Sequence, residues 1–160
     1  MGALVCTPKK PLCDECPLIE RCVAFSNSEQ LNYPVKAKKI KITKRKLDYI
    51  LVQDKENILI QQRIEKDIWH KLYEFILIEK EQVDSEFIVN LFPNVITIDK
   101  SHIFKHKLSH QHIDAVFWEV HVSDLKAVKW KNSFQINKKD IQNYSIPKLL
   151  DNYLLTRDKK

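Results

Sequence analysis

The chain has 160 residues, of which 44% are hydrophobic, and it carries 27 Lys and Arg against 21 Asp and Glu, a formal net charge of +6. Met1 is followed by neither a basic region nor a long apolar run, and no stretch approaches the ~18 consecutive apolar residues of a membrane span, so we expect no signal peptide and no membrane partner. The charge favours a polyanion such as nucleic acid, although acidic proteins and anionic membranes would also attract it.

The first element, residues 4–22, holds all four cysteines of the chain: Cys6, Cys13, Cys16 and Cys22. Clustered cysteines in a reducing, cytoplasmic setting bind metal more often than they form disulfides. Four-thiolate zinc sites usually combine two distant C-x2-C pairs. The spacing C-x6-C-x2-C-x5-C instead allows four thiolates close in sequence to surround one compact group. It therefore favours a cubane iron–sulfur cluster, with zinc or inert thiols as alternatives.

A basic segment follows at residues 35–46. Within "KAKKIKITKRK", residues 36–46, seven of eleven residues are Lys or Arg. The segment has no useful apolar face, so we predict an extended, self-repelling linker between residues 1–34 and a domain at 47–160. It serves either as a solubilising tether or as a DNA-backbone contact through Lys38, Lys39 and Lys41.

The strand patterns of the second part predict a sheet. They occupy residues 47–53, 57–63, 71–79 and 95–122, and the last of these holds a short strand and then a hairpin with its turn near "LSHQH". The first two runs are joined by "DKEN", a turn-rich loop that predicts a hairpin.

Two helices are predicted beside these strands. Residues 84–92 have Asp84 or Ser85 as an N-cap. Apolar residues at 146, 149, 150, 153 and 154 follow a Ser145 cap with the spacing of an amphipathic helix. This order of strands and helices predicts an α/β sandwich.

The order of elements also resembles the Nudix fold, which makes Nudix hydrolase an alternative. That activity requires a glycine and an Arg-Glu-x-x-Glu-Glu arrangement to hold Mg²⁺ against a diphosphate. The corresponding region, "EFILIEKEQVDSEFIVNLF", has neither. We therefore interpret its acids, Glu79, Glu81, Asp84 and Glu86, as a solvated edge and not as a metal site.

The cysteine segment "GALVCTPKKPLCDECPLIERC" resembles the iron–sulfur loop of helix-hairpin-helix DNA glycosylases, the endonuclease III and MutY-type enzymes. The resemblance implies that the four cysteines ligate a 4Fe-4S cluster. It also implies that Lys9 and Lys10, between the first two ligands, contact DNA phosphates. Two solvated lysines in a proline-rich turn are the alternative interpretation.

The second part resembles the Nudix-like domain of MutY-type adenine DNA glycosylases, which inspects the guanine opposite the target adenine. The resemblance lies in "RIEKDIWHKLYEFILIE" (63–79), "FKHKLSHQHID" (104–114) and "SIPKLLDNYL" (145–154). The chain departs from the family at Ile76, where proline is usual, at His70 and Lys71, which replace a frequent Gly-Gly, and at Leu108, where Phe usually stands. We expect the aromatic residues of the first block to pack in the core.

The resemblance implies that Ser109 and His110 recognise 8-oxoguanine, with Leu108 as an apolar wedge. Oxidation turns guanine N7 from an acceptor into an N–H donor, and a hydroxyl can accept from it. A metal site of His102, His106, His110 and His112 is a less favoured alternative.

The catalytic helical domain of that family would precede Met1. We therefore expect a monomeric C-terminal portion that binds double-stranded DNA containing 8-oxoguanine opposite adenine and is inactive without its N-terminal glycosylase domain. In the isolated chain we expect a labile cluster, because Leu4, Val5 and Phe25 would lack their packing partner. The alternative is a stand-alone zinc- or cluster-stabilised nucleic-acid-binding module without lesion specificity.

Overall fold

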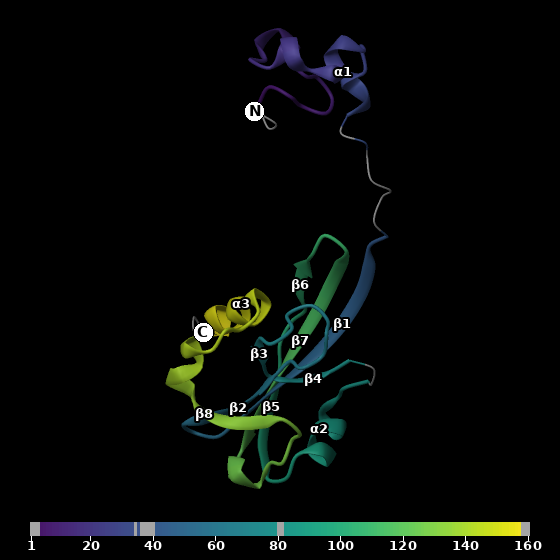
Figure 1. The fold of residues 1–160 in the computed structure, drawn as a ribbon. Coiled ribbons are helices and arrows are strands. Elements are labelled where there is room, and N and C mark those ends of the chain that lie inside the picture. Colours follow the sequence, from purple (N-terminus) through teal and green to yellow (C-terminus); the bar gives the residue numbers. More distant parts are fainter. Residues whose placement is uncertain (1–3, 34, 36–40, 80–81, 158–160) are drawn as a thin grey trace. The chain divides into compact units, whose positions relative to one another are not determined.

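The computed structural model describes residues 4–33, 35, 41–79 and 82–157. The chain divides into two compact units, Met1–Ile40 and Lys41–Lys160 (Figure 1). The predicted linker is wrong at its C-terminal end, because residues 43–46 already belong to the first strand. Lys38 and Lys39 lie outside the described residues.

The described residues of the first unit form short helical turns. They are η1 (Cys13–Glu15), η2 (Ile19–Arg21), α1 (Val23–Ser26) and η3 (Gln30–Asn32). None of its described residues is buried. A segment this short has too little apolar surface to build a core of its own, as the sequence predicts.

The second unit is built on one eight-stranded mixed sheet. Its strands are β1 (Thr43–Gln53), β2 (Asn57–Gln62), β3 (Tyr73–Glu74), β4 (Ile76–Ile78), β5 (Val95–Lys100), β6 (Phe104–Lys107), β7 (Gln111–Val122) and β8 (Ser133–Asn137). The order is β3-β2-β1-β7-β5, with β4 paired to β1, β6 to β7 and β8 to β2. The long β1–β7 pair is parallel, and the other pairs are antiparallel.

The predicted β1–β2 hairpin is confirmed. Its turn is held by Asp54, whose Oδ1 accepts from the backbone N–H groups of Glu56 (2.9 Å) and Asn57 (2.7 Å). The single strand predicted at residues 71–79 is instead two short strands, because β3 pairs with β2 whereas β4 pairs with β1. Strand β8 was not predicted, since its polar residues hide the alternation.

Both predicted helices are present, and one differs at its start. Helix α2 (Ser85–Leu91) has the predicted cap, because Asp84 Oδ1 accepts from the Phe87 N–H at 2.8 Å. Helix α3 (Lys148–Arg157) begins after Pro147, which suits a helix start. Ser145 is therefore not its cap, and the Ser145 carbonyl accepts from the Tyr73 N–H. Two 3-10 helices, η4 (Leu125–Ala127) and η5 (Lys138–Asn143), complete the unit.

Two apolar clusters cover the two faces of the sheet. Alternate residues of β1 and β7 point to opposite faces. Thus Phe117 lies in the cluster under α3, where it stacks between Tyr49 (centroids 5.4 Å apart) and Tyr153 (3.9 Å). Trp118 and Ile88 belong to the cluster under α2. The helices lie on opposite sides of the β1–β7 pair (Figure 1), which confirms the predicted sandwich.

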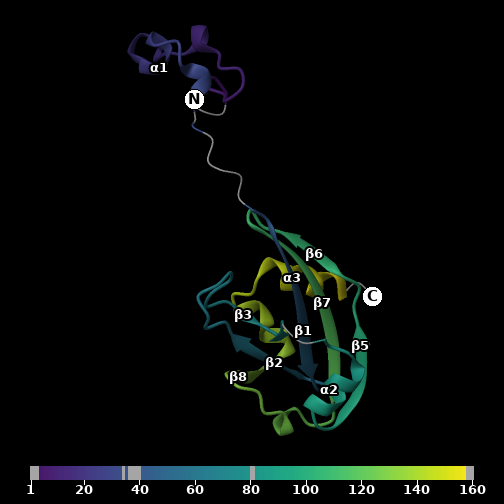
Figure 2. The same ribbon diagram turned by 90° about the vertical axis from the view of Figure 1, so that its right-hand side faces the viewer.

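The β6–β7 hairpin and the start of β1 project beyond α3 at one end of this unit (Figures 1 and 2). This end carries Ser109 and His110, the residues that the sequence analysis predicts to recognise the lesion. Within the described ranges, no helix has the length and apolar character that a membrane span requires.

Candidate nucleic-acid interface

The tip of the β6–β7 hairpin consists of Ser109 and His110. The Leu108 N–H donates to the Gln111 carbonyl at 2.8 Å, which leaves only these two residues in the turn. Both are exposed, and neither has a positive φ. In the part of the chain that the structure describes, the Ser109 hydroxyl has no hydrogen-bond partner. The turn therefore presents a hydroxyl and an imidazole to an incoming ligand.

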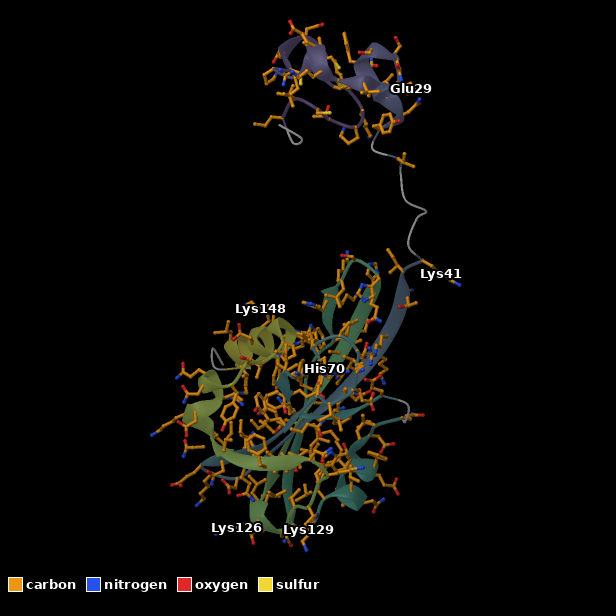
Figure 3. The ribbon with its side chains drawn as sticks, in the orientation of Figure 1. Glu29, Lys41, His70, Lys126, Lys129 and Lys148 are labelled. Carbon is orange, nitrogen blue, oxygen red and sulfur yellow. The ribbon has the colours of Figure 1, made fainter. Side chains whose placement is uncertain are left out.

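The tip is fastened to the first residue of β1. The Thr43 N–H and the Thr43 hydroxyl both donate to the His110 carbonyl, at 3.1 and 3.3 Å. Parallel pairing of Thr43 with Gln111 continues this contact along the sheet. Sequence reasoning missed Thr43, because only long-range strand pairing brings it to the tip. The same pairing places the exposed Lys41, two residues earlier, at this end of the sheet (Figure 3).

Leu108 is half-buried and packs against the cluster under α3. On the same side of β6, the Phe104 ring contacts Phe117 and Tyr153 edge-on, with centroids 5.4 and 5.5 Å apart. Leu108 thus helps to attach the hairpin to the core. Its insertion between DNA bases stays a prediction.

The loop at residues 63–72 contacts the hairpin through Trp69. The Trp69 ring packs edge-on against the His106 ring of β6, with centroids 5.7 Å apart. Backbone bonds close the loop, from Lys71 N–H to Arg63 C=O and from Arg63 N–H to Leu72 C=O, both 2.9 Å. Lys71 has φ 66°, a left-handed conformation that favours glycine. This conformation is consistent with the glycine that is frequent at this position in the MutY-type block that residues 63–79 resemble.

The aromatic residues of this block pack in the core as predicted. Phe75 is fully buried, and Trp69 and Tyr73 pack against the cluster under α3. The block therefore has a structural role and forms no part of the exposed tip.

Arginine and carboxylate side chains form a partly buried network behind this loop. Arg63 contacts Glu74 at 2.9 Å and Asp67 at 3.1 Å, and Arg45 contacts Asp67 at 2.5 Å and Glu79 at 2.7 Å. Burial raises the pKa of Glu74 although Arg63 opposes it. Burial works against a low pKa for Asp67, but the Ile68 amide and the two guanidiniums lower it.

Two of the acids of the Nudix region have structural roles. Glu79 belongs to the arginine network, and Asp84 caps α2. Glu86 is exposed on α2, and Glu81 lies outside the described residues. Over residues 4–33, 41–79 and 82–157, no three His, Cys, Asp or Glu side chains are grouped so that they could hold a metal ion. The histidines near the hairpin instead make ring contacts, His102 with Phe104 and His106 with Trp69.

The four cysteines of the first unit line one small cavity of about 70 Å³, together with apolar side chains such as Val5, Leu12 and Phe25. Partial desolvation, followed by the charges of the other cysteines and Asp14, raises the pKa of Cys13. Four thiols in an apolar lining are a donor set of the kind that a four-iron cluster takes, although the structure does not group three of them closely enough to hold a single metal ion.

The loop between the first two cysteines is closed by its own hydrogen bonds. The Leu12 N–H donates to the Val5 carbonyl at 2.9 Å, and the Thr7 hydroxyl donates to the Lys10 carbonyl at 2.6 Å. Lys9 and Lys10 are exposed on this loop. Their contact with DNA phosphates stays a prediction.

Both units match known families. Residues 48–156 match the family of the NUDIX domain, and residues 6–22 match the iron–sulfur binding domain of endonuclease III. The chain is 36% identical over 114 residues to the adenine DNA glycosylase of Buchnera aphidicola subsp. Schizaphis graminum, covering 69% of this chain and 32% of that protein. It is 25% identical over 160 residues to the same enzyme of subsp. Acyrthosiphon pisum, covering 96% of this chain and 45% of that protein.

Solved structures agree on the fold. The C-terminal domain of mouse MUTYH, solved in a complex with human PCNA, superposes with a TM-score of 0.59 at 10% identity, covering 72% of this chain and 88% of that one. The MutT protein from Methanosarcina mazei Go1 superposes with a TM-score of 0.50 at 13% identity, covering 77% and 97%. At these identities the likeness concerns the fold alone.

The chain spans 32% and 45% of the length of the two curated relatives named above. Its NUDIX match covers more than half of its own residues. The cysteine segment precedes that domain in the order expected from the sequence. The chain belongs to the NUDIX domain family and corresponds to the C-terminal part of MutY-type adenine DNA glycosylases, with an endonuclease III iron–sulfur segment ahead of the NUDIX domain.

Proposed function

We propose that this chain serves DNA base-excision repair by recognising 8-oxoguanine opposite adenine, as the lesion-reading portion of an adenine DNA glycosylase. The observation that carries the proposal is the exposed two-residue tip of Ser109 and His110, held in place by Thr43 and by the packing of Leu108. The relation to adenine DNA glycosylases supports it.

The chemistry of the tip suits the lesion. Guanine presents N7 as an acceptor, whereas 8-oxoguanine presents an N7–H donor and an O8 acceptor. The Ser109 hydroxyl is free to accept from N7–H, and the neighbouring His110 ring supplies a donor for O8. Because the two residues share one turn, both are able to face a single base.

The first unit carries the proposed cofactor. Cys6, Cys13, Cys16 and Cys22 would hold a 4Fe-4S cluster, which supplies four metal–thiolate bonds that order a segment without its own core. The ordered loop would then hold Lys9 and Lys10 toward DNA phosphates. Anaerobic reconstitution followed by iron and sulfide analysis tests this assignment, and stoichiometric zinc without sulfide would contradict it.

Base removal is assigned to a separate glycosylase domain. Among the least exposed acids of the described residues, Glu74 belongs to the arginine network, Asp48 accepts from the Trp118 indole N–H and Glu119 accepts from the Tyr153 hydroxyl. We expect the chain alone to release no adenine from a duplex with adenine opposite 8-oxoguanine. Release above a no-protein control, lost on substitution of an acid of this chain, would contradict this assignment.

Lesion recognition is tested by fluorescence anisotropy with two duplexes that differ only in 8-oxoguanine or guanine opposite adenine. A well-formed polar readout of one base is worth roughly 1–3 kcal/mol, so we expect about a ten- to hundredfold preference for the lesion. Ser109→Ala should remove most of that preference. The control is Ser123→Ala, an equal change at another exposed serine.

The outcomes separate the two candidate functions. Equal binding of both duplexes by the folded wild type would favour a nucleic-acid-binding module without lesion specificity. Preference restored only when the helical glycosylase domain is added in trans would place lesion recognition in the two-part assembly.

A further inference from the structure

Four lysines line up on one face of the sheet beside the hairpin. Lys44 of β1 and Lys107 of β6 both pair with His112 of β7, one from each side. Lys46 and Lys105 pair in the same way with Asp114. We call Lys44, Lys46, Lys105 and Lys107 the basic ladder. The repeated K-x-K spacing in "TKRKL" and "FKHKL" is the sequence signal, but only the strand register places the two runs in the same rows.

The basic ladder is presented to solvent. All four lysines are exposed, whereas the alternate residues Leu47 and Ile113 point to the opposite face and are buried. The ladder therefore shares the face of the α2 cluster but lies at the hairpin end of the sheet, whereas α2 covers the other end (Figure 1).

The charge of this face is positive. Two aspartates, Asp48 and Asp114, lie on the same face as the four lysines. One of them, Asp48, is buried and already accepts from the Trp118 indole N–H at 3.1 Å and pairs with Lys46 at 3.1 Å. Farther along the same face, Lys100 lies over the Trp118 ring, with Nζ 4.4 Å from its centroid. The face is thus a cationic surface and not a balanced ion-pair network.

The dimensions suit a nucleic-acid backbone. Successive rows of a strand face are about 6.7 Å apart, and lysines on either side of one strand are about 9.6 Å apart. Duplex DNA carries about one phosphate charge per 1.7 Å of its axis, so the spacing of the four flexible side chains would allow them to reach several phosphates at once.

The ladder is continuous with the tip. Lys107 precedes Ser109 by two residues, and Lys44 follows Thr43, which binds the His110 carbonyl. A duplex whose base contacts the tip would bring its flanking backbone over this face. We propose that the basic ladder binds the phosphates of duplex DNA that flank the base held at the tip. This proposal rests on the proposed function and adds a surface to it.

The test compares two pairs of substitutions of equal charge in the full chain. One variant carries Lys44→Gln and Lys107→Gln, and the control carries Lys126→Gln and Lys129→Gln, at the opposite end of the unit (Figure 3). Anisotropy titrations with both duplexes over a range of salt concentrations give the affinity and the slope of log K against log salt. Thermal melting checks that each variant is folded.

The ladder variant should lose about tenfold in affinity at low salt, and its salt slope should fall by about 1.8, which corresponds to ~0.9 for each phosphate that is no longer neutralised. The control should keep the wild-type slope. Replacing the two ladder lysines by arginine should keep it as well, because the charge is retained. The ratio of affinities for the two duplexes should not change.

Equal losses in the ladder and control variants would overturn the proposal, because they would reflect net charge alone. An unchanged slope in the ladder variant, or tighter binding to single-stranded RNA of equal length, would overturn it too. Failure of the proposed function is distinct: it would abolish the lesion preference of the wild type and leave the slope difference intact.

Discussion

The two units of this chain are stabilised in different ways. In the first unit, no described residue is buried, and the exposed fractions of Leu4, Val23 and Leu31 reach 79%, 72% and 67%. In the second unit, two apolar clusters fill both faces of a mixed sheet. The second unit therefore has its own core, whereas the described residues of the first unit form none.

This difference has a consequence for function. The hairpin tip is attached to a rigid core and to β1, so its geometry does not depend on a cofactor. The loop with Lys9 and Lys10 is closed by local bonds beside the cysteine cavity, and under the proposed function a cluster in that cavity would order it further. The following experiments test how far the two units are independent.

The largest effect is expected in the first unit, after reconstitution with the proposed 4Fe-4S cluster. Cys16→Ser should abolish loading and expose residues 4–33 to protease, because metal binding supplies folding free energy of order 10 kcal/mol in small cysteine-rich sites. Limited proteolysis with mass spectrometry measures this. Glu29→Gln, in the same unit, is the control. A fall in the melting temperature of the second unit would show that the units are coupled.

The next effect is expected at the buried end of the arginine network. Glu74→Ala leaves Arg63 buried without its main partner and should lower the free energy of unfolding by about 3–5 kcal/mol. Replacing Glu74 and Arg63 together by methionine should cost much less, because no uncompensated charge remains. Urea unfolding measures both variants. A double variant as unstable as the single one would contradict this account.

A smaller, pH-dependent effect is expected for Asp67→Asn. The pKa of Asp67 lies below its ordinary value of 3.8 in the folded state, so its ionised form stabilises the fold above that pH and the contribution is lost as the pH falls through the folded pKa. We expect a loss of about 1 kcal/mol at pH 7, modest because the pair with Arg45 is partly solvated. Urea unfolding should show a smaller difference in stability between the wild type and the Asp67→Asn variant at pH 3 than at pH 7. An equal difference at both pH values would refute the assignment.

The smallest effect is a gain. Lys71→Gly should raise the free energy of unfolding by about 0.5–1 kcal/mol, because glycine adopts φ 66° without strain, although it loses more entropy on folding. Lys66→Gly, at an exposed position of the same loop without a positive φ, is the control. Thermal melting compares the two, and a loss of stability at Lys71 would mean that its side chain contributes more than its strain costs.

Local patterns in the sequence determined much of this protein. Runs of apolar and β-branched residues predicted β1, β2 and β7, and the Asp84 cap predicted α2, because these signals depend only on neighbours in the chain. The cysteine spacing predicted a common site, and the four side chains do line one cavity. The turn at Ser109 and His110 was predicted from the "LSHQH" segment.

Only the tertiary structure decided what surrounds that turn. Parallel pairing joins Thr43 to a tip 67 residues away, aligns the lysines of β1 and β6 and extends the domain into the predicted linker. The same long-range pairing divides residues 73–78 between two partners, β2 and β1. The pairing of strands distant in sequence depends on which faces become buried together, and no local pattern records that choice.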